Sequence, residues 1–170
     1  VSLSQLGRFA EATGHEAEAI RLASSTRHAF TIGWAHYAGG MLHLLKGDWA
    51  KARALVEHWI VVLRTGNVVI LLPHAVASST WVLAQLGEAS EALDRLREGE
   101  QLLERQEARG IVGYHGWVYH LLGRAGLLLG RLDEARRLAE RAVESSPGRP
   151  GFLAHALHLL GDIATHPDRF

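Results

Sequence analysis

Histidine is the residue type in this chain best able to do chemistry, and eleven histidines are spread over its 170 residues. His155, His158 and Asp162 are three and four residues apart, so on a helix their side chains would share one face. Imidazole and carboxylate groups at this spacing can ligate a metal ion. His15-Glu16, in contrast, is not followed by a histidine at the spacing of zinc proteases. Because histidines on a repeat surface usually serve only as polar side chains, we expect no metal site and no cofactor.

Other catalytic patterns are absent from the sequence. It contains no Gly-x-x-x-x-Gly-Lys phosphate loop and no Gly-x-Ser-x-Gly nucleophile turn. It has no cysteine, which excludes disulfides, thiol catalysis and zinc–cysteine sites. Most acidic residues fall on amphipathic segments, where a carboxylate ordinarily belongs to a solvated face. We therefore expect a protein that is not an enzyme.

The charge balance favours neither a nucleic acid nor a membrane as partner. Basic and acidic residues number 18 each, so the chain has no general attraction for phosphate backbones or anionic lipids. No apolar run reaches the roughly 18 residues that span a bilayer. The segment Val1-Ser-Leu-Ser lacks the features of a secretion signal. We expect a cytoplasmic location, and a chain that does not begin with methionine is expected to be part of a longer protein.

A glycine followed by a helix-forming segment recurs along the chain. The clearest copy is Gly130-Arg-Leu-Asp-Glu-Ala, and weaker copies begin at Gly7, Gly47 and Gly87. The first two intervals between these glycines are 40 residues and the third is 43. A fixed period of this size is typical of stacked helical repeats.

Two kinds of helix are expected to alternate along this period. Nearly uncharged helices are predicted over residues 28–45, 71–86, 111–129 and 152–164. Charged, amphipathic helices are predicted over residues 9–24, 48–65, 88–108 and 131–146. An uncharged helix must be covered on more than one side, which places these helices in an inner layer. Short connections that contain glycine favour antiparallel hairpins.

The predicted fold class is therefore all-α, as an α-solenoid of antiparallel helix hairpins with about four repeats and a partial fifth. We expect one superhelical domain over residues 1–170. Its units are expected at about residues 1–26 (partial), 27–66, 67–110, 111–149 and 150–170 (partial).

The repeat resembles the tetratricopeptide repeat, a helix–turn–helix unit with small residues at set positions around its turn. The fourth unit fits best, with the family's aromatic, leucine, glycine, alanine and proline positions at Tyr119, Leu122, Gly123, Gly130, Ala135, Ala142 and Pro147. The earlier units keep fewer positions: Gly7, Ala12, Ala19, then Gly40, Gly47, Ala52, then Gly87, Ala92. The period here exceeds the family's 34 residues. Trp59 and Gly99 also stand where the second alanine is expected.

The resemblance implies a concave groove lined by the first helix of each unit. Carried over position by position, its residues here are Trp34, Tyr37, Met41, His74, Trp81, Gln85, Trp117, His120, Arg124, Leu127, His155 and His158. Tryptophan, tyrosine and arginine are frequent anchors of binding surfaces. The alternative is that these rings only pack the inner helices together.

These residues predict non-catalytic protein–protein interaction through an aromatic–histidine groove, with Arg124 available for an acidic group. The partner would be a protein or peptide, or a neighbouring domain of the same protein. Two alternatives remain: a small-molecule sensor that uses the same groove, or an architectural array that self-associates. In the second case the incomplete fifth unit leaves an apolar end, through which a homodimer could form.

A narrower resemblance concerns residues 116–125 and 155–170. Their amino-acid sequence is similar to the C-terminal repeat region of large bacterial signalling proteins, which join cyclase or DNA-binding domains to an ATPase module. This resemblance implies a regulatory scaffold segment of such a protein.

Overall fold

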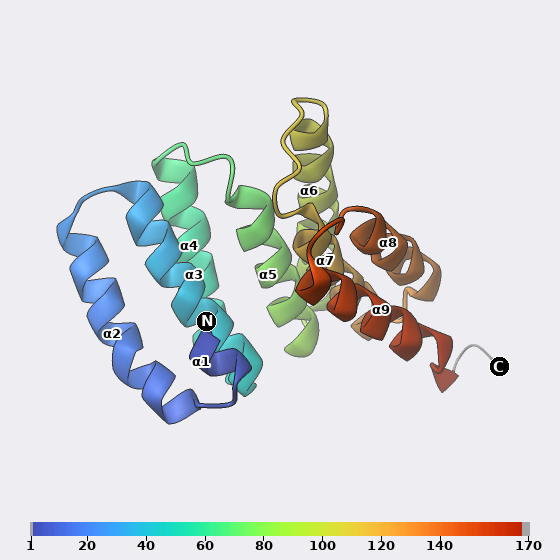
Figure 1. The fold of residues 1–170 in the computed structure, drawn as a ribbon, viewed down its shortest axis with the longest axis horizontal. Helices are drawn as coiled ribbons and strands as arrows, with labels where there is room; N and C mark the ends of the chain where they lie inside the picture. The colour runs from blue at the N-terminus through green and yellow to red at the C-terminus, as the bar shows by residue number, and fades with distance from the viewer. Residues whose placement is uncertain (1, 168–170) are drawn as a thin grey trace. The chain divides into compact units, whose positions relative to one another are not determined.

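The computed structural model describes residues 2–167, and the regular elements of that range are α-helices (Figure 1). In chain order they are α1 (Ser2–Gln5), α2 (Phe9–Ser25), α3 (Ala29–Lys46), α4 (Trp49–Thr65), α5 (Leu72–Gln85), α6 (Ala89–Glu107), α7 (His115–Leu128), α8 (Leu132–Glu144) and α9 (Pro150–Ala164). The predicted all-α helical-repeat fold class is confirmed. Between residues 2 and 167, no helix has the length and apolar character needed to cross a lipid bilayer.

Residue contacts divide the chain into two compact units, residues 1–75 and 76–170, which we describe separately. The first turn of α5 belongs to the first unit and the rest of that helix to the second. The arrangement of all five predicted repeat segments in one superhelical domain stays a prediction.

In the first unit, α3 packs against both α2 and α4. The middle of α3 is buried because this helix carries only one full charge, Lys46, whereas α2 buries only Ala12 and Ala23. Gly47 ends α3 in the left-handed conformation at φ 80°. The Asp48 side chain then accepts a hydrogen bond from the Lys51 amide at 3.4 Å, as expected for the cap of α4.

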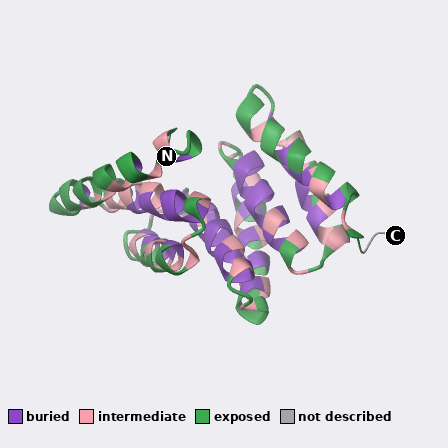
Figure 2. Cartoon of the chain, turned by 90° about the horizontal axis from the view of Figure 1, so that it is seen from below, coloured by how far each residue is buried: buried purple, intermediate pink, exposed green. Residues whose placement is uncertain are grey.

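In the second unit, α7 lies against α6, α8 and α9. Every residue of the range 115–126 except Arg124 is buried, as expected for an inner helix. The charged helix α8 buries only one face, formed by Ala135, Leu138, Ala139 and Ala142. Helix α9, which lies beside the C-terminal label in Figure 2, also carries much exposed surface.

One predicted helix boundary differs from the structure by more than two residues. Helix α7 begins at His115 instead of residue 111, because Gly110 takes a φ of 71° and residues 111–114 form a loop. The left-handed conformation at Gly110 ends α6, and a second glycine at position 113 weakens helix formation before His115.

Trp59 and Gly99, which depart from the family's second alanine position, each pack against a residue of contrasting size. A Cβ atom on Gly33 would lie 3.3 Å from Nε1 of Trp59, so the glycine on α3 makes room for the tryptophan on α4. A Cβ atom on Gly99 would lie 3.0 Å from the Leu122 side chain. A small residue on one helix therefore accommodates a large one on the next, and the helices keep their close packing.

Glycine at position 116 is predicted to be required for the packing of α7 on the end of α8. A Cβ atom there would lie 3.1 Å from the carbonyl oxygens of Ala142 and Ser145, which cannot rotate away. We expect Gly116→Ala to lower the free energy of unfolding by about 1–3 kcal/mol. Gly113→Ala is the matched control, because nothing lies within 4 Å of its Cβ position. Urea unfolding of both variants measures the difference, and equal stabilities would contradict this packing.

Candidate binding surface

Predicted groove residues of the second unit form a cluster of rings on α7 and α9. Trp117 and His120 stack with ring centroids 5.0 Å apart and an interplanar angle of 26°. His155 approaches both rings, at 5.0 Å from Trp117 and 5.3 Å from His120. Phe152, which the prediction did not include, stacks on the Trp117 ring, with the two ring centroids 5.9 Å apart. The helical spacing of residues 152 and 155 on α9 brings both rings to Trp117.

An ion pair lies on the same two helices. Arg124 on α7 donates a hydrogen bond of 2.5 Å to Oδ2 of Asp162 on α9. The Arg124 guanidinium also lies 5.7 Å from the centroid of the Trp81 ring, a cation–π contact. His158 places Nδ1 3.4 Å from the same Asp162 oxygen, one helical turn away. The predicted cation is therefore already paired with a carboxylate of its own chain.

The pairing of Asp162 with Arg124 had a signal in the sequence that the prediction did not use. Each is the only full charge on an otherwise uncharged helix segment, and they are 38 residues apart, close to one repeat period. Equivalent positions of successive repeats lie side by side, so two isolated opposite charges one period apart are expected to meet.

The structure does not bring three potential metal ligands together. Across residues 2–167, no group of three His, Asp or Glu side chains is arranged to hold a metal ion. Asp162 forms an ion pair with Arg124, and the His155 ring contacts the rings of Trp117 and His120.

We name Trp117, His120, Arg124, His155, His158 and Asp162 the α7–α9 face. Burial is the main cause that lowers the pKa of His120 to about 3, and the neighbouring His155, Arg124 and His158 lower it further. Burial also lowers the pKa of His155, with smaller contributions from His158 and Arg124. These two rings are therefore neutral at pH 7.

Two buried polar atoms of this face lack hydrogen-bond partners. Nε1 of Trp117 and Nδ1 of His120 are both enclosed, and neither has a partner within the described range of residues. A buried polar group without a partner costs free energy, so these two rings are held in place by stacking and packing.

Another polar cluster fixes α7 between its neighbours. The Tyr119 hydroxyl donates to Glu107 on α6 at 2.9 Å, and Arg141 on α8 donates to both oxygens of Glu107 at 2.8 Å. Burial is the first cause that raises the pKa of Tyr119 to about 12, and the hydrogen bond to Glu107 adds to it. This network links three helices and thereby holds the helix that carries Trp117 and Arg124.

In the first unit, the predicted residues lie in a ring cluster that is largely internal. The Tyr37 ring lies 5.3 Å from Trp34, 4.7 Å from His74 and 5.2 Å from Trp59. Met41 and His74 expose only 2% and 4% of their surface. Gln85 and Leu127, in the second unit, are half-buried. The role of all these residues in partner binding stays a prediction.

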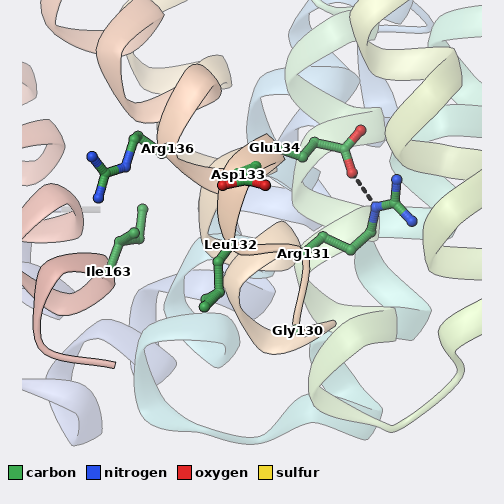
Figure 3. Close-up of a pocket in the computed structure, with 7 residues that line it drawn as sticks. All are labelled: Gly130, Arg131, Leu132, Asp133, Glu134, Arg136 and Ile163. Atoms are coloured by element: carbon green, nitrogen blue, oxygen red, sulfur yellow. Dashed lines mark hydrogen bonds and ion pairs between the residues drawn. The ribbon is translucent and has the colours of Figure 1, made fainter. Parts of the chain in front are cut away.

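A hollow in the second unit is lined by residues that do not belong to the α7–α9 face (Figure 3). It measures about 550 Å³ and is lined by Gly130, Arg131, Leu132, Asp133, Glu134, Arg136 and Ile163. Arg131 pairs with Glu134 along the first turn of α8, as the dashed line in Figure 3 marks. None of the predicted site residues lines this hollow, and its charged side chains are those of an outer helix.

The lowered pKa of His120 predicts a loss of stability in mild acid. An unfolded histidine has a pKa of about 6.5, so below that pH the unfolded chain binds a proton that the folded chain excludes. The stability that neutral His120 contributes is present above pH 6.5 and is lost as the pH falls towards 3. From pH 7 to pH 5 the loss is about 2 kcal/mol for this residue.

Urea unfolding at pH 7 and pH 5 measures this effect. We expect His120→Phe to remove about 2 kcal/mol of the pH dependence, and Leu157→Gln on the exposed side of α9 to leave it intact. An unchanged pH dependence in His120→Phe would show that this ring accepts protons in the folded protein.

Comparison with known proteins gives matches for two of the helix hairpins. Residues 33–58, in α3 and α4, and residues 116–141, in α7 and α8, match the tetratricopeptide repeat family model. Searches of curated proteins and of solved structures give no match. Tetratricopeptide repeats generally mediate protein–protein interaction and are generally non-catalytic. The matches support the resemblance that the sequence predicts: both hairpins are similar to the tetratricopeptide repeat.

Proposed function

We propose that this chain is a non-catalytic interaction module that binds a protein or peptide partner through the α7–α9 face. The observation that carries this proposal is the juxtaposition of the Trp117–His120–His155 ring cluster with the Arg124–Asp162 ion pair on two packed helices. Tryptophan, tyrosine and arginine are enriched among the residues that anchor partner proteins.

The chemistry of this face favours a segment that offers an apolar or aromatic side chain next to an acidic one. The exposed part of the ring cluster is His155, which covers the buried rings of Trp117 and His120. It is neutral at pH 7, because burial lowers its pKa. An acidic group of the partner would replace Asp162 on Arg124, so the guanidinium exchanges one carboxylate for another. Bidentate contact with a carboxylate is a common use of arginine in recognition.

For the biological setting, we propose a regulatory or scaffold segment of a larger cytoplasmic bacterial signalling protein. The support for this setting is the resemblance of residues 116–125 and 155–170 to the repeat regions of such proteins. Neighbouring domains of the same protein are then candidate partners, beside separate proteins.

Binding can be tested with a displayed library of random peptides selected on the wild-type chain. We expect the selected peptides to carry an acidic residue near an apolar or aromatic residue. The double variant Trp81→Ala/Arg124→Gln is expected to weaken their binding at least tenfold by titration calorimetry, since it removes the cation of the face and the α5 ring that lies against it. The matched control is Arg97→Gln, which alters an exposed ion pair on α6.

The circular dichroism spectrum and the unfolding midpoint establish that each variant is folded. Wild-type affinity in the folded double variant would refute the role of this surface.

Self-association is a second candidate, and one feature of α9 favours it. Leu157 exposes 53% of its surface on a helix whose only full charge, Asp162, is already paired. Two copies could cover this apolar side without burying a charge. Sedimentation velocity is expected to show a dimer for the wild-type chain and a monomer for Leu157→Glu. A monomeric wild-type chain at 100 μM (about tenfold above ordinary assay conditions) would remove this candidate.

A further inference from the structure

A small cavity in the first unit carries features that the proposed function does not use. It measures about 120 Å³ and lies among α1, α2 and α3. Its apolar wall includes Ala12, Ala35, Ala38 and Leu42. This volume is slightly below the roughly 150 Å³ of an engineered apolar cavity that holds benzene in another protein. The exposed residue Ala19 also lines it, so the cavity reaches the protein surface.

Two buried polar side chains face this apolar space. Ser4 is only 3% exposed, and its Oγ has no hydrogen-bond partner among residues 2–167. The side chain of Glu16 is only 6% exposed. Its carboxylate contacts Nε2 of His43 at 2.9 Å and Nζ of Lys51 at 3.3 Å, in both cases through Oε2. The other oxygen, Oε1, lies beside Gly39, which also lines the cavity.

From this arrangement we infer that the cavity binds a small neutral hydroxyl compound with a compact hydrocarbon body of about benzene size. The hydrocarbon body fills the alanine-lined space. The hydroxyl donates a hydrogen bond to the Glu16 carboxylate and accepts one from the Ser4 hydroxyl, which satisfies the buried group that now lacks a partner. This site is separate from the α7–α9 face and does not depend on the proposed function.

The charges around Glu16 select a neutral ligand over a cationic one. Lys51 already places a full positive charge 3.3 Å from the carboxylate. A second cation in a cavity of this size would be repelled by Lys51 and would lose its hydration on entry. A hydroxyl group gains the hydrogen bonds without adding a charge.

Phenol and toluene provide a matched pair of probes, because they have the same number of heavy atoms and differ in the hydroxyl. Titration calorimetry and thermal unfolding of the whole chain measure their binding. We expect phenol to raise the unfolding midpoint saturably and to bind at least fivefold more tightly than toluene. Protonated cyclohexylamine is expected to bind more weakly than phenol.

Variants assign the binding to this cavity. Ser4→Ala is expected to weaken phenol about five- to tenfold and to leave toluene unchanged, because only the hydroxyl contact is lost. Ala38→Leu fills the cavity and is expected to abolish binding of both probes. Ser24→Ala is the control, since Ser24 is exposed on α2 and its hydroxyl donates to the Ile20 carbonyl.

Three results would overturn the inference. The first is the absence of any saturable stabilisation by phenol. The second is equal affinity for phenol and toluene, and the third is tighter binding of the protonated amine. If Ala38→Leu is unfolded by circular dichroism, the comparison of Ser4→Ala with Ser24→Ala decides the location: equal affinities for phenol would place it elsewhere.

Discussion

The structure depends on one constraint: helices that carry almost no charge must be covered closely by neighbouring helices. Helices α3 and α7 cannot face water over much of their surface, so neighbouring helices must approach them closely. Small residues make this approach possible. A Cβ atom on Gly123 would lie 2.8 Å from the Leu159 side chain, and one on Gly126 would lie 3.4 Å from Ala135. The glycines of α7 thus admit both α8 and α9 to van der Waals contact.

The same constraint determines which polar groups the inner helices can hold. A charge on such a helix needs a partner, since burial of an unpaired charge is costly. Arg124 on α7 is paired with Asp162 on α9. The carboxylate of Glu16, which reaches α3 from α2, is likewise contacted by Nζ of Lys51. Burial lowers the pKa values of His74 and His120 to about 3, so both rings stay neutral at pH 7. Both proposed binding sites therefore lie where a polar side chain interrupts an apolar surface.

Much of the fold could be predicted because its signals are local. Gly7, Gly47, Gly87 and Gly130 have φ values between 71° and 80°, a conformation that other residues rarely adopt. The spacing of these glycines in the sequence therefore gives the length of the structural repeat. The alternation of uncharged and charged helices follows from composition alone. The loop at residues 111–114 was missed because its apolar residues resemble the helix that follows them.

The candidate sites were less predictable because they depend on pairs of residues far apart in the sequence. Trp117, His120 and His155 were predicted for one surface, and the structure brings these three rings together. Phe152 and Asp162 were not predicted as members of that surface. The cavity beside Ser4 arises from three helices packed together, and no spacing along one helix reveals it.

Hydrogen–deuterium exchange in the presence of a selected peptide tests whether partners bind the α7–α9 face, because it locates the contact without any substitution. We expect slower exchange in residues 115–128 and 150–164, which form α7 and α9, and unchanged exchange in α6. Protection confined to α6 or to the first unit, with α7 and α9 unaffected, would contradict it.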